Sequence, residues 1–311
     1  MSEVGEKMVD TEIKDVKSNG KTEVGSEMKN VQAMRVKISN KKERAMKSKS
    51  TKRARRKNPE IPFWKRFWYA AFYVVWTFAV VMASQFVVGI VAGMIIEDAS
   101  EMTPVVSGII SLLSYVLAVV ILIFVTPQIG LAWQIQREKQ AKTEGKLGLA
   151  KISREELGLK GWPTWTDIGL SPVAFVVATF GAALLMGLFS AFPWFNAEEV
   201  QETGFSLYLY GADRIIAFLV LVVLAPIAEE IIFRGFLYGK LRRKISAPTA
   251  VIVTSVLFGL MHFQWNVGVN VFALSVVLCV LREITGTIYS GILAHMIKNG
   301  VAFFMLYVIG M

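Results

Sequence analysis

The stretch Leu224–Lys244, LAPIAEEIIFRGFLYGKLRRK, decides the fold because it places two glutamates and an arginine inside an apolar run. About 20 apolar residues are needed to span the hydrocarbon core of a bilayer, and each charge inside it costs about 2.5–3.5 kcal/mol on insertion scales. Glu230 and Arg234 lie four residues apart on one helical face and can pair, whereas Glu229 points about 100° away. The pattern predicts that the pair supports the helix and that Glu229 faces a cavity; a purely structural ion cluster is the alternative.

The rest of the 311-residue chain is also strongly apolar, with 54% hydrophobic residues and a mean hydropathy of +0.50. This composition excludes an ordinary soluble domain and predicts an all-α, polytopic membrane helix bundle of about seven transmembrane helices. The sixth expected span is short and has polar neighbours, so it fits a span least well. Its Cys279 is the single cysteine, which excludes an intrachain disulfide. The expected spans are 67–96, 105–125, 172–192, 213–238, 247–263, 267–281 and 287–309.

The first 60 residues form a separate, basic segment. They hold 17 of the 34 Lys and Arg residues and 9 of the 24 Asp and Glu residues, a net charge of +8 out of +10 for the chain. Without an apolar run they cannot offset chain entropy, so we expect a disordered tail with no cleavable signal. Basic clusters next to a span attract anionic lipid, and nucleic acid is not the expected partner.

Basic loops also predict the orientation and the domain boundaries. Three basic segments are expected on the same side of the membrane: the tail, the connection 134–167 and the KLRRK segment 240–244. Their excess of Lys and Arg predicts that this side is the cytoplasmic one. The chain is therefore expected to be a multi-pass protein of the cell membrane with a cytoplasmic N-terminus. Within the connection, the Ser153 cap followed by Glu156 predicts a short interfacial helix. The expected parts are the tail 1–60, two membrane helices with the connection 61–148, and a catalytic membrane domain 149–311.

The two histidines of the chain, His262 and His295, both lie in late expected spans. His295 shares a helical face with Asn299, and Phe258, four residues before His262, is expected to pack beneath that ring. At 1.5 Å per residue, Glu229, His262 and His295 lie roughly 21, 24 and 20 Å from the expected cytoplasmic ends of their helices. The three side chains are therefore expected in one layer.

A carboxylate, two imidazoles and a carboxamide in one cavity predict a hydrolytic site. Glu229 can take a proton from water that His262 orients. His295 and Asn299 can donate hydrogen bonds to the oxyanion that develops on a scissile carbonyl. The same set, Glu229, His262 and His295, could instead hold a divalent metal such as zinc, although no HExxH motif is present. Both chemistries are open, and we favour direct activation of water by Glu and His without a cofactor.

Three motifs on successive late spans carry a resemblance to a known family. They are Glu229-Glu230-x-x-x-Arg234, Phe258-x-x-x-His262 and His295-x-x-x-Asn299. In this order they resemble the CAAX protease and bacteriocin-processing (CPBP) family of intramembrane proteases, also called the Abi family, which includes the endoprotease that trims prenylated CaaX proteins. The resemblance covers about residues 149–308, including the LGLKGWPTWTDIGL segment at 157–170.

The resemblance implies a helical membrane bundle with a conical cavity that opens toward the cytoplasm and carries endopeptidase chemistry. It makes Glu229 the residue that activates water and His262, His295 and Asn299 its catalytic partners. Glu230 and Arg234 become supporting residues, as we expect for Phe258. The substrate implied is a membrane-associated or prenyl/CaaX-like peptide or protein; the CaaX substrate itself does not follow from the motifs.

Two further classes of function compete with the endopeptidase. A non-catalytic membrane scaffold or bacteriocin-immunity-type protein would keep the fold without the activity. A transporter could use the same polar residues as an ion path, but the sequence shows no repeat symmetry or paired broken helices. Because the full polar set is retained, the sequence favours the enzyme.

Overall fold

The computed structural model describes residues 62–96, 103–129, 152–201, 205 and 209–310, and every regular element in these ranges is a helix. The fold described below is that of the unit Phe63–Met311. The predicted disordered tail and its lipid contact lie outside the described residues, as does the connection from 130 to 151.

Six helices are long and apolar enough to cross a membrane, and one further apolar helix is shorter. The all-α class is confirmed. The fifth predicted span is α9 (Ala247–Leu260), whose 14 residues extend about 21 Å, less than the roughly 30 Å of a hydrocarbon core. The sixth, which fitted a span least well by sequence, is a full 21-residue helix. The six long helices are Phe63–Ile95, Pro104–Ile129, Trp165–Phe189, Gly211–Arg242, Trp265–Thr285 and Tyr289–Ile309.

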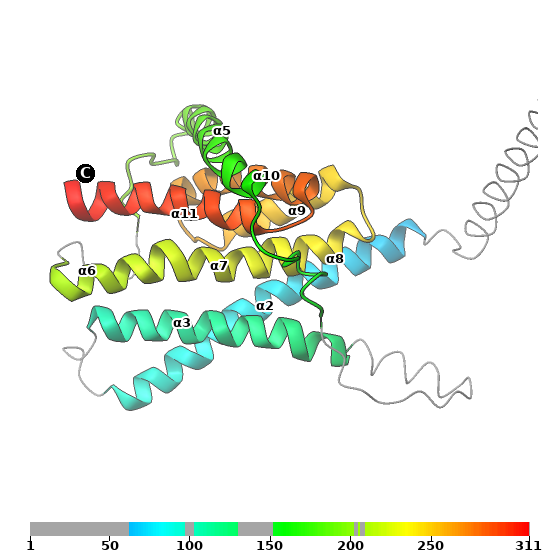
Figure 1. Ribbon diagram of the computed structural model, residues 1–311, viewed down its shortest axis with the longest axis horizontal. Helices are drawn as coiled ribbons and strands as arrows, with labels where there is room; N and C mark the ends of the chain where they lie inside the picture. The colour runs from blue at the N-terminus through cyan, green and yellow to red at the C-terminus, as the bar shows by residue number, and fades with distance from the viewer. Residues whose placement is uncertain (1–61, 97–102, 130–151, 202–204, 206–208, 311) are drawn as a thin grey trace, which may run out of the picture. The chain divides into compact units, whose positions relative to one another are not determined.

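The long helix Gly211–Arg242 runs through the middle of the bundle, with α2 and α3 on one side and α5, α9, α10 and α11 on the other (Figure 1). Several long helices contain π-helical segments, labelled η. In chain order the elements are α2 (Phe63–Ile95), α3 (Pro104–Val120), η2 (Ile121–Val125), α5 (Trp165–Phe189), α6 (Gly211–Phe218), η3 (Leu219–Leu224), α7 (Ala225–Glu230), η4 (Ile231–Tyr238), α8 (Gly239–Arg242), α9 (Ala247–Leu260), α10 (Trp265–Thr285), α11 (Tyr289–Phe304) and η5 (Met305–Ile309).

A proline explains how the central helix departs from regular α geometry. In η3 the hydrogen bonds run from residue i to i−5, so that the backbone N–H of Ala225 donates to the carbonyl of Val220. The next carbonyl, that of Leu221, would need the N–H of residue 226, which is Pro226 and has none. The wider π turn also gives room to the proline ring. The helix therefore continues through Pro226 but leaves the Leu221 carbonyl free for a side chain.

Two glycines allow α9 and α10 to approach closely. A Cβ added at Gly259 would lie 2.8 Å from the carbonyl oxygen of Gly268, and one added at Gly268 would lie 3.0 Å from that of Gly259. Both clashes are with backbone, which cannot move aside without separating the helices. The short helix α9 is thereby held against a full span.

Gly259→Ala is therefore expected to destabilise the folded protein by about 1–3 kcal/mol, as overpacking of a close contact does. Thermal unfolding of the purified protein in detergent measures the change. Gly169→Ala is the matched control, because a Cβ at Gly169 in α5 meets no atom within 4 Å. Equal midpoint temperatures of unfolding for Gly259→Ala and Gly169→Ala would show that the contact between α9 and α10 is not tight.

The segment before α5 forms a turn rather than the predicted interfacial helix. Ser153 does cap it, since its Oγ accepts a hydrogen bond from the backbone N–H of Glu156 at 3.2 Å. After one turn Gly158 adopts φ +80°, a left-handed conformation that ends the turn. Its carbonyl then accepts a hydrogen bond from the N–H of Ile288 at 3.1 Å, which ties the segment to the start of α11 instead of letting a helix continue.

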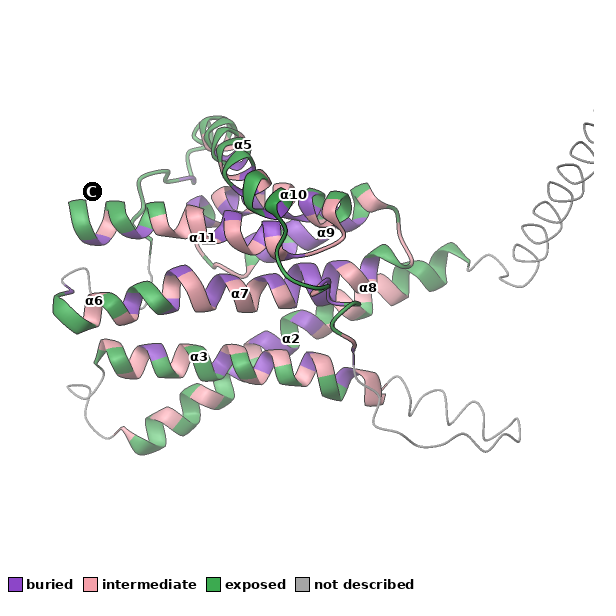
Figure 2. Cartoon of the chain, in the orientation of Figure 1, coloured by how far each residue is buried: buried purple, intermediate pink, exposed green. Residues whose placement is uncertain are grey.

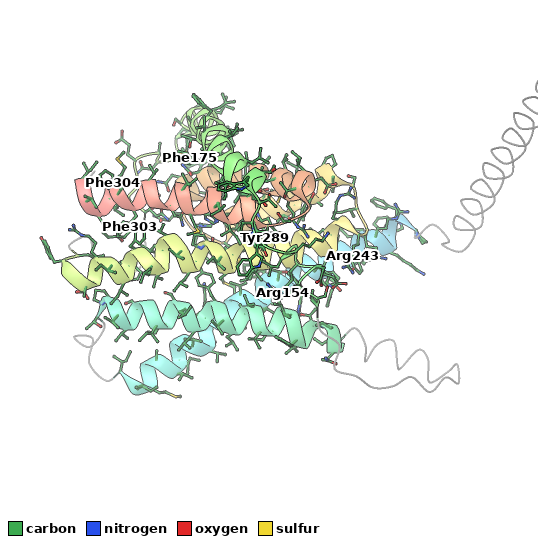
Figure 3. The ribbon with its side chains drawn as sticks, viewed as in Figure 1. Arg154, Phe175, Arg243, Tyr289, Phe303 and Phe304 are labelled. Atoms are coloured by element: carbon green, nitrogen blue, oxygen red, sulfur yellow. The ribbon has the colours of Figure 1, made fainter. Side chains whose placement is uncertain are left out.

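This segment is also fixed by polar contacts at one end of the bundle. Arg243 pairs with Glu156 at 2.9 Å, and the Tyr289 hydroxyl donates to the carbonyl of Gly161 at 2.8 Å. Figure 3 shows Arg154, Arg243 and Tyr289 near that end, whereas Phe303 and Phe304 lie toward the other. These polar contacts thus lie at the end of the bundle that carries the basic segment 240–244.

The outward faces of the helices are apolar and exposed, and the buried residues lie where helices meet (Figure 2). Phe86 on α2 and Phe180 on α5, for example, are 70% and 74% exposed. Such surfaces are covered by lipid in a bilayer. Together with the six long apolar helices, they indicate a multi-pass membrane protein.

Candidate active site

The predicted pair of Glu230 and Arg234 is present and completely buried. The Arg234 guanidinium donates through Nη1 to Glu230 Oε1 at 2.9 Å, and both side chains are 0% exposed. The guanidinium carbon also lies 4.4 Å from the centre of the Phe258 ring, close enough for a cation–π interaction. The predicted contact between Glu230 and Arg234 is therefore present, and Arg234 lies in the π segment η4.

A glycine on α11 makes room for the Glu230 carboxylate. A Cβ at Gly291 would lie 3.0 Å from Glu230 Oε2, tighter than ordinary contact. Gly291 is one helical turn before His295, so the space next to it brings α11 against α7 at the level of the glutamates.

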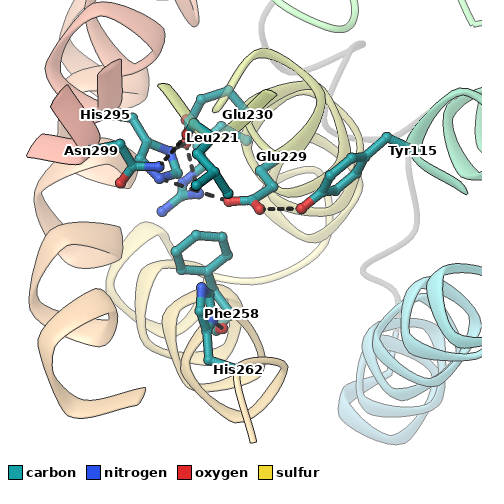
Figure 4. A network of polar contacts seen from close by, with 9 residues as sticks. Tyr115, Leu221, Glu229, Glu230, Phe258, His262, His295 and Asn299 are labelled. Carbon is teal, nitrogen blue, oxygen red and sulfur yellow. Dashed lines mark hydrogen bonds and ion pairs between the residues drawn. The ribbon is translucent and has the colours of Figure 1, made fainter. Parts of the chain in front are cut away.

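His295 lies between the two glutamates. Its Nδ1 is 3.2 Å from Glu230 Oε1, and its Nε2 is 3.7 Å from Glu229 Oε2 (Figure 4). An ionised carboxylate only accepts hydrogen bonds, so Nδ1 carries the proton of the contact with Glu230. Glu230 therefore does more than pair with Arg234: it fixes the imidazole so that Nε2 faces Glu229. Sequence spacing gave no sign of this contact because Glu230 and His295 lie 65 positions apart.

Glu229 also has a partner that the sequence analysis missed. The Tyr115 hydroxyl, on α3, donates to Glu229 Oε1 at 2.6 Å, the short distance typical of a hydrogen bond to a charged oxygen. The two residues are 114 positions apart, and Tyr115 has no motif around it. Tyr115 thus hydrogen-bonds one oxygen of the Glu229 carboxylate, and His295 lies 3.7 Å from the other oxygen on the opposite side (Figure 4).

The His262 ring is oriented by a backbone carbonyl in the last turn of α9. Its Nδ1 lies 2.9 Å from the carbonyl oxygen of Phe258. A carbonyl oxygen can only accept a hydrogen bond, so Nδ1 carries a proton. In a neutral ring the lone pair is then on Nε2. The Phe258 ring packs edge-on against both imidazoles, with its centre 5.1 Å from that of His262, where contact was predicted, and 5.9 Å from that of His295. Directly after His262, Phe263 adopts φ +55°, a strained conformation for a bulky residue.

Asn299 uses the carbonyl that Pro226 leaves free. Its Nδ2 donates to the Leu221 carbonyl at 2.9 Å, which joins α11 to η3. An amide nitrogen carries two hydrogens, so one donor remains for another acceptor. The proline in the central helix therefore determines where the Asn299 carboxamide is held.

One cavity of about 200 Å³ connects these residues. Glu229, His262, His295 and Asn299 all line it, so the four residues expected to share a cavity lie around one. Tyr115 and Lys298 line it as well, and neither was among the residues expected from the sequence. Lys298 could have been noticed as a charged residue one position before Asn299 in an expected span.

The predicted metal set is only partly matched by this geometry. Among the described residues no three His, Cys, Asp or Glu side chains are grouped so as to hold a metal ion. The ring nitrogen Nδ1 of each histidine is already used, by Phe258 and Glu230, and Glu229 Oε1 by Tyr115.

Comparison with known proteins connects this site to a family. Residues 211–301 match the family model of the type II CAAX prenyl endopeptidase Rce1-like proteins, a region that includes all three motifs. The protein described as "Putative membrane peptidase YdiL" of Bacillus subtilis (strain 168) is 25% identical over 135 residues, which are 43% of this chain and 55% of that protein. The chain thus matches only about half the length of this relative. No solved structure matches it. The match at 211–301 confirms the resemblance to the CPBP family that the three motifs gave, and it identifies this region as Rce1-like.

Proposed function

We propose that the protein is an intramembrane endopeptidase that hydrolyses a peptide bond in a membrane-associated substrate, with Glu229 as the base that activates water. The observation that carries this proposal is the Glu229 carboxylate in a polar cavity between Tyr115 and His295, with His262 on the same cavity wall. The Rce1-like match over 211–301 supports the reaction class, and a prenyl or CaaX-like substrate is the finer part of the proposal.

In the proposed reaction, Glu229 removes a proton from a water molecule that also hydrogen-bonds to the lone pair of His262 Nε2. The water oxygen forms a bond to the scissile carbonyl carbon, whose oxygen becomes an oxyanion. The free N–H of Asn299 donates a hydrogen bond to it, and His295 donates a second one when its Nε2 carries a proton. The carbon–nitrogen bond then breaks, and protonated Glu229 gives its proton to the leaving amine. The products are one carboxylic acid and one amine, and transfer of a proton between them gives the carboxylate and the ammonium ion.

A comparison of protein termini in membranes tests the proposal. Cells that lack the protein are supplied with the wild type or with Glu229→Gln, and new N- and C-termini of membrane proteins are mapped. We expect termini that appear with the wild type and are absent with Glu229→Gln, since only the former can activate water. Identical termini in both would refute the endopeptidase and favour the scaffold.

The metal question needs a separate measurement. Cleavage by the purified protein is followed before and after dialysis against a chelator, with the metal content measured in parallel. Direct activation by Glu229 predicts an unchanged rate. Loss of activity that zinc restores would assign Glu229, His262 and His295 to a metal instead.

A further inference from the structure

A second polar cavity lies between α2 and α3, next to the catalytic one. Its volume is about 210 Å³, and Val81, Gln85 and Tyr115 line both cavities. The other lining residues all belong to α3 and are Ile110, Ser111, Ser114 and Ala118. A water molecule takes up about 30 Å³ in the liquid, so this cavity has room for several. Neither α2 nor α3 falls within the region 211–301 that matches the family model.

The polar groups of this cavity are costly on helices that lie in lipid. Gln85 belongs to the apolar helix α2, and its carboxamide forms no hydrogen bond within the part of the chain that the structure describes. The Ser111 hydroxyl is equally without a partner among the described residues, whereas that of Ser114 donates to the Ile110 carbonyl at 2.8 Å. Lipid tails offer no hydrogen bonds to such groups. Water in the cavity offers donors and acceptors to all three.

Tyr115 connects this cavity to the base of the proposed reaction (Figure 4). Its hydroxyl donates to Glu229 Oε1 at 2.6 Å, and a phenolic oxygen that donates one hydrogen bond can still accept another. A water molecule in the second cavity can therefore donate to the Tyr115 oxygen, one hydrogen bond away from the carboxylate. Because Gln85 and Tyr115 line both spaces, the polar lining continues from one into the other.

Peptide hydrolysis between apolar helices needs a supply of water. Each turnover consumes one water molecule, which must be replaced before the next turnover. The catalytic cavity measures only about 200 Å³, and a bound substrate displaces water from it. A second polar space that adjoins Glu229 keeps water close to the base while the substrate is bound.

We propose that the cavity between α2 and α3 is a water site, and that it delivers the hydrolytic water to Glu229 past Gln85 and the Tyr115 hydroxyl. The inference rests on the proposed function and goes beyond it by assigning the route by which water enters. The competing role for Gln85 is a hydrogen bond to the peptide substrate. That role changes KM, whereas delivery of water changes kcat and requires the cavity to be wet without any substrate.

Cysteine accessibility tests whether the cavity holds water. The single cysteine, Cys279, is replaced by alanine, and Ser111→Cys or Leu113→Cys is added. Leu113 is the matched control, because it lies two residues further along α3 and is 51% exposed on the apolar surface. The protein is placed in lipid nanodiscs, which leave both membrane faces open, and a charged methanethiosulfonate reagent is added. It reacts with the thiolate, which forms in water, so we expect Ser111→Cys to react about 10–100-fold faster than Leu113→Cys.

Gln85→Leu tests the delivery of water to Glu229, because it replaces the carboxamide by an apolar group of similar size. Kinetics are measured on the mapped peptide, which spans the bond found by the comparison of termini. We expect kcat to fall about 10-fold with KM within about 2-fold of the wild type, and labelling of Ser111→Cys to slow in the same background. Gln85→Asn keeps a carboxamide and is expected to recover most of both rates. Thermal unfolding of each variant verifies that it is folded.

Equal labelling rates for Ser111→Cys and Leu113→Cys would overturn the proposal. An unchanged kcat in Gln85→Leu, or a rise in KM alone, would reject the delivery of water while the endopeptidase stands. The labelling does not depend on cleavage, so it decides the water site separately. The absence of any bond cut by the wild type and spared by Glu229→Gln would instead reject the proposed function and, with it, the delivery step.

Discussion

Glu229→Gln is expected to lower kcat for the mapped peptide by about 10²–10⁴-fold, the contribution of a positioned general base. An amide cannot accept a proton from water at neutral pH, yet its carbonyl oxygen can still accept the hydrogen bond from Tyr115. The shape of the cavity is thereby kept, and the stability of the protein is expected to change by less than about 1 kcal/mol. Initial rates in detergent and thermal unfolding are measured on the same preparations.

The control is Glu198→Gln, which makes the same chemical change at an exposed position in the segment between α5 and α6. It is expected to retain wild-type kcat. Should Glu229→Gln keep more than a tenth of the wild-type rate, the base would have to be sought elsewhere, and Glu230 is too completely buried to replace it.

Arg234→Met is expected to destabilise the protein by about 3–5 kcal/mol, the usual cost of breaking a buried ion pair. The change leaves the Glu230 carboxylate buried without its cation, since both side chains are 0% exposed. It also removes the contact of the guanidinium with the Phe258 ring. Equilibrium unfolding in mixed micelles with increasing denaturing detergent measures the loss.

The double variant Glu230→Gln/Arg234→Met distinguishes a stranded charge from lost packing. It is expected to be more stable than Arg234→Met alone, because no uncompensated carboxylate remains. Arg154→Met, at an exposed arginine, is the control and is expected to lie within about 0.5 kcal/mol of the wild type. A double variant less stable than the single one would show that Glu230 is held in place by His295 rather than by Arg234.

Patterns within short stretches of the sequence predicted most of the helices and, in the site, the contacts between residues of the same helix. Apolar run lengths located six membrane helices to within a few residues at most ends. Position along a helix placed Arg234 next to Glu230 and Phe258 beneath His262. These predictions succeeded because residues four apart on a helix meet whatever surrounds the helix. The length of the apolar run gave a wrong prediction at α9, which is too short to span the bilayer. A helix that packs closely against its neighbours, as α9 does through Gly259 and Gly268, does not need to span the bilayer itself.

The sequence by itself determined a helical membrane bundle, a buried Glu230–Arg234 pair, and the layer in which Glu229, His262 and His295 meet. Only the tertiary structure decided the partners of those residues, Tyr115 on Glu229 and Glu230 on His295, and the polar cavity that adjoins the site. The reason is physical. Helical periodicity fixes which face a residue takes, but which face of another helix it meets depends on close contacts far apart in sequence, such as Gly291 against Glu230, that leave no local pattern.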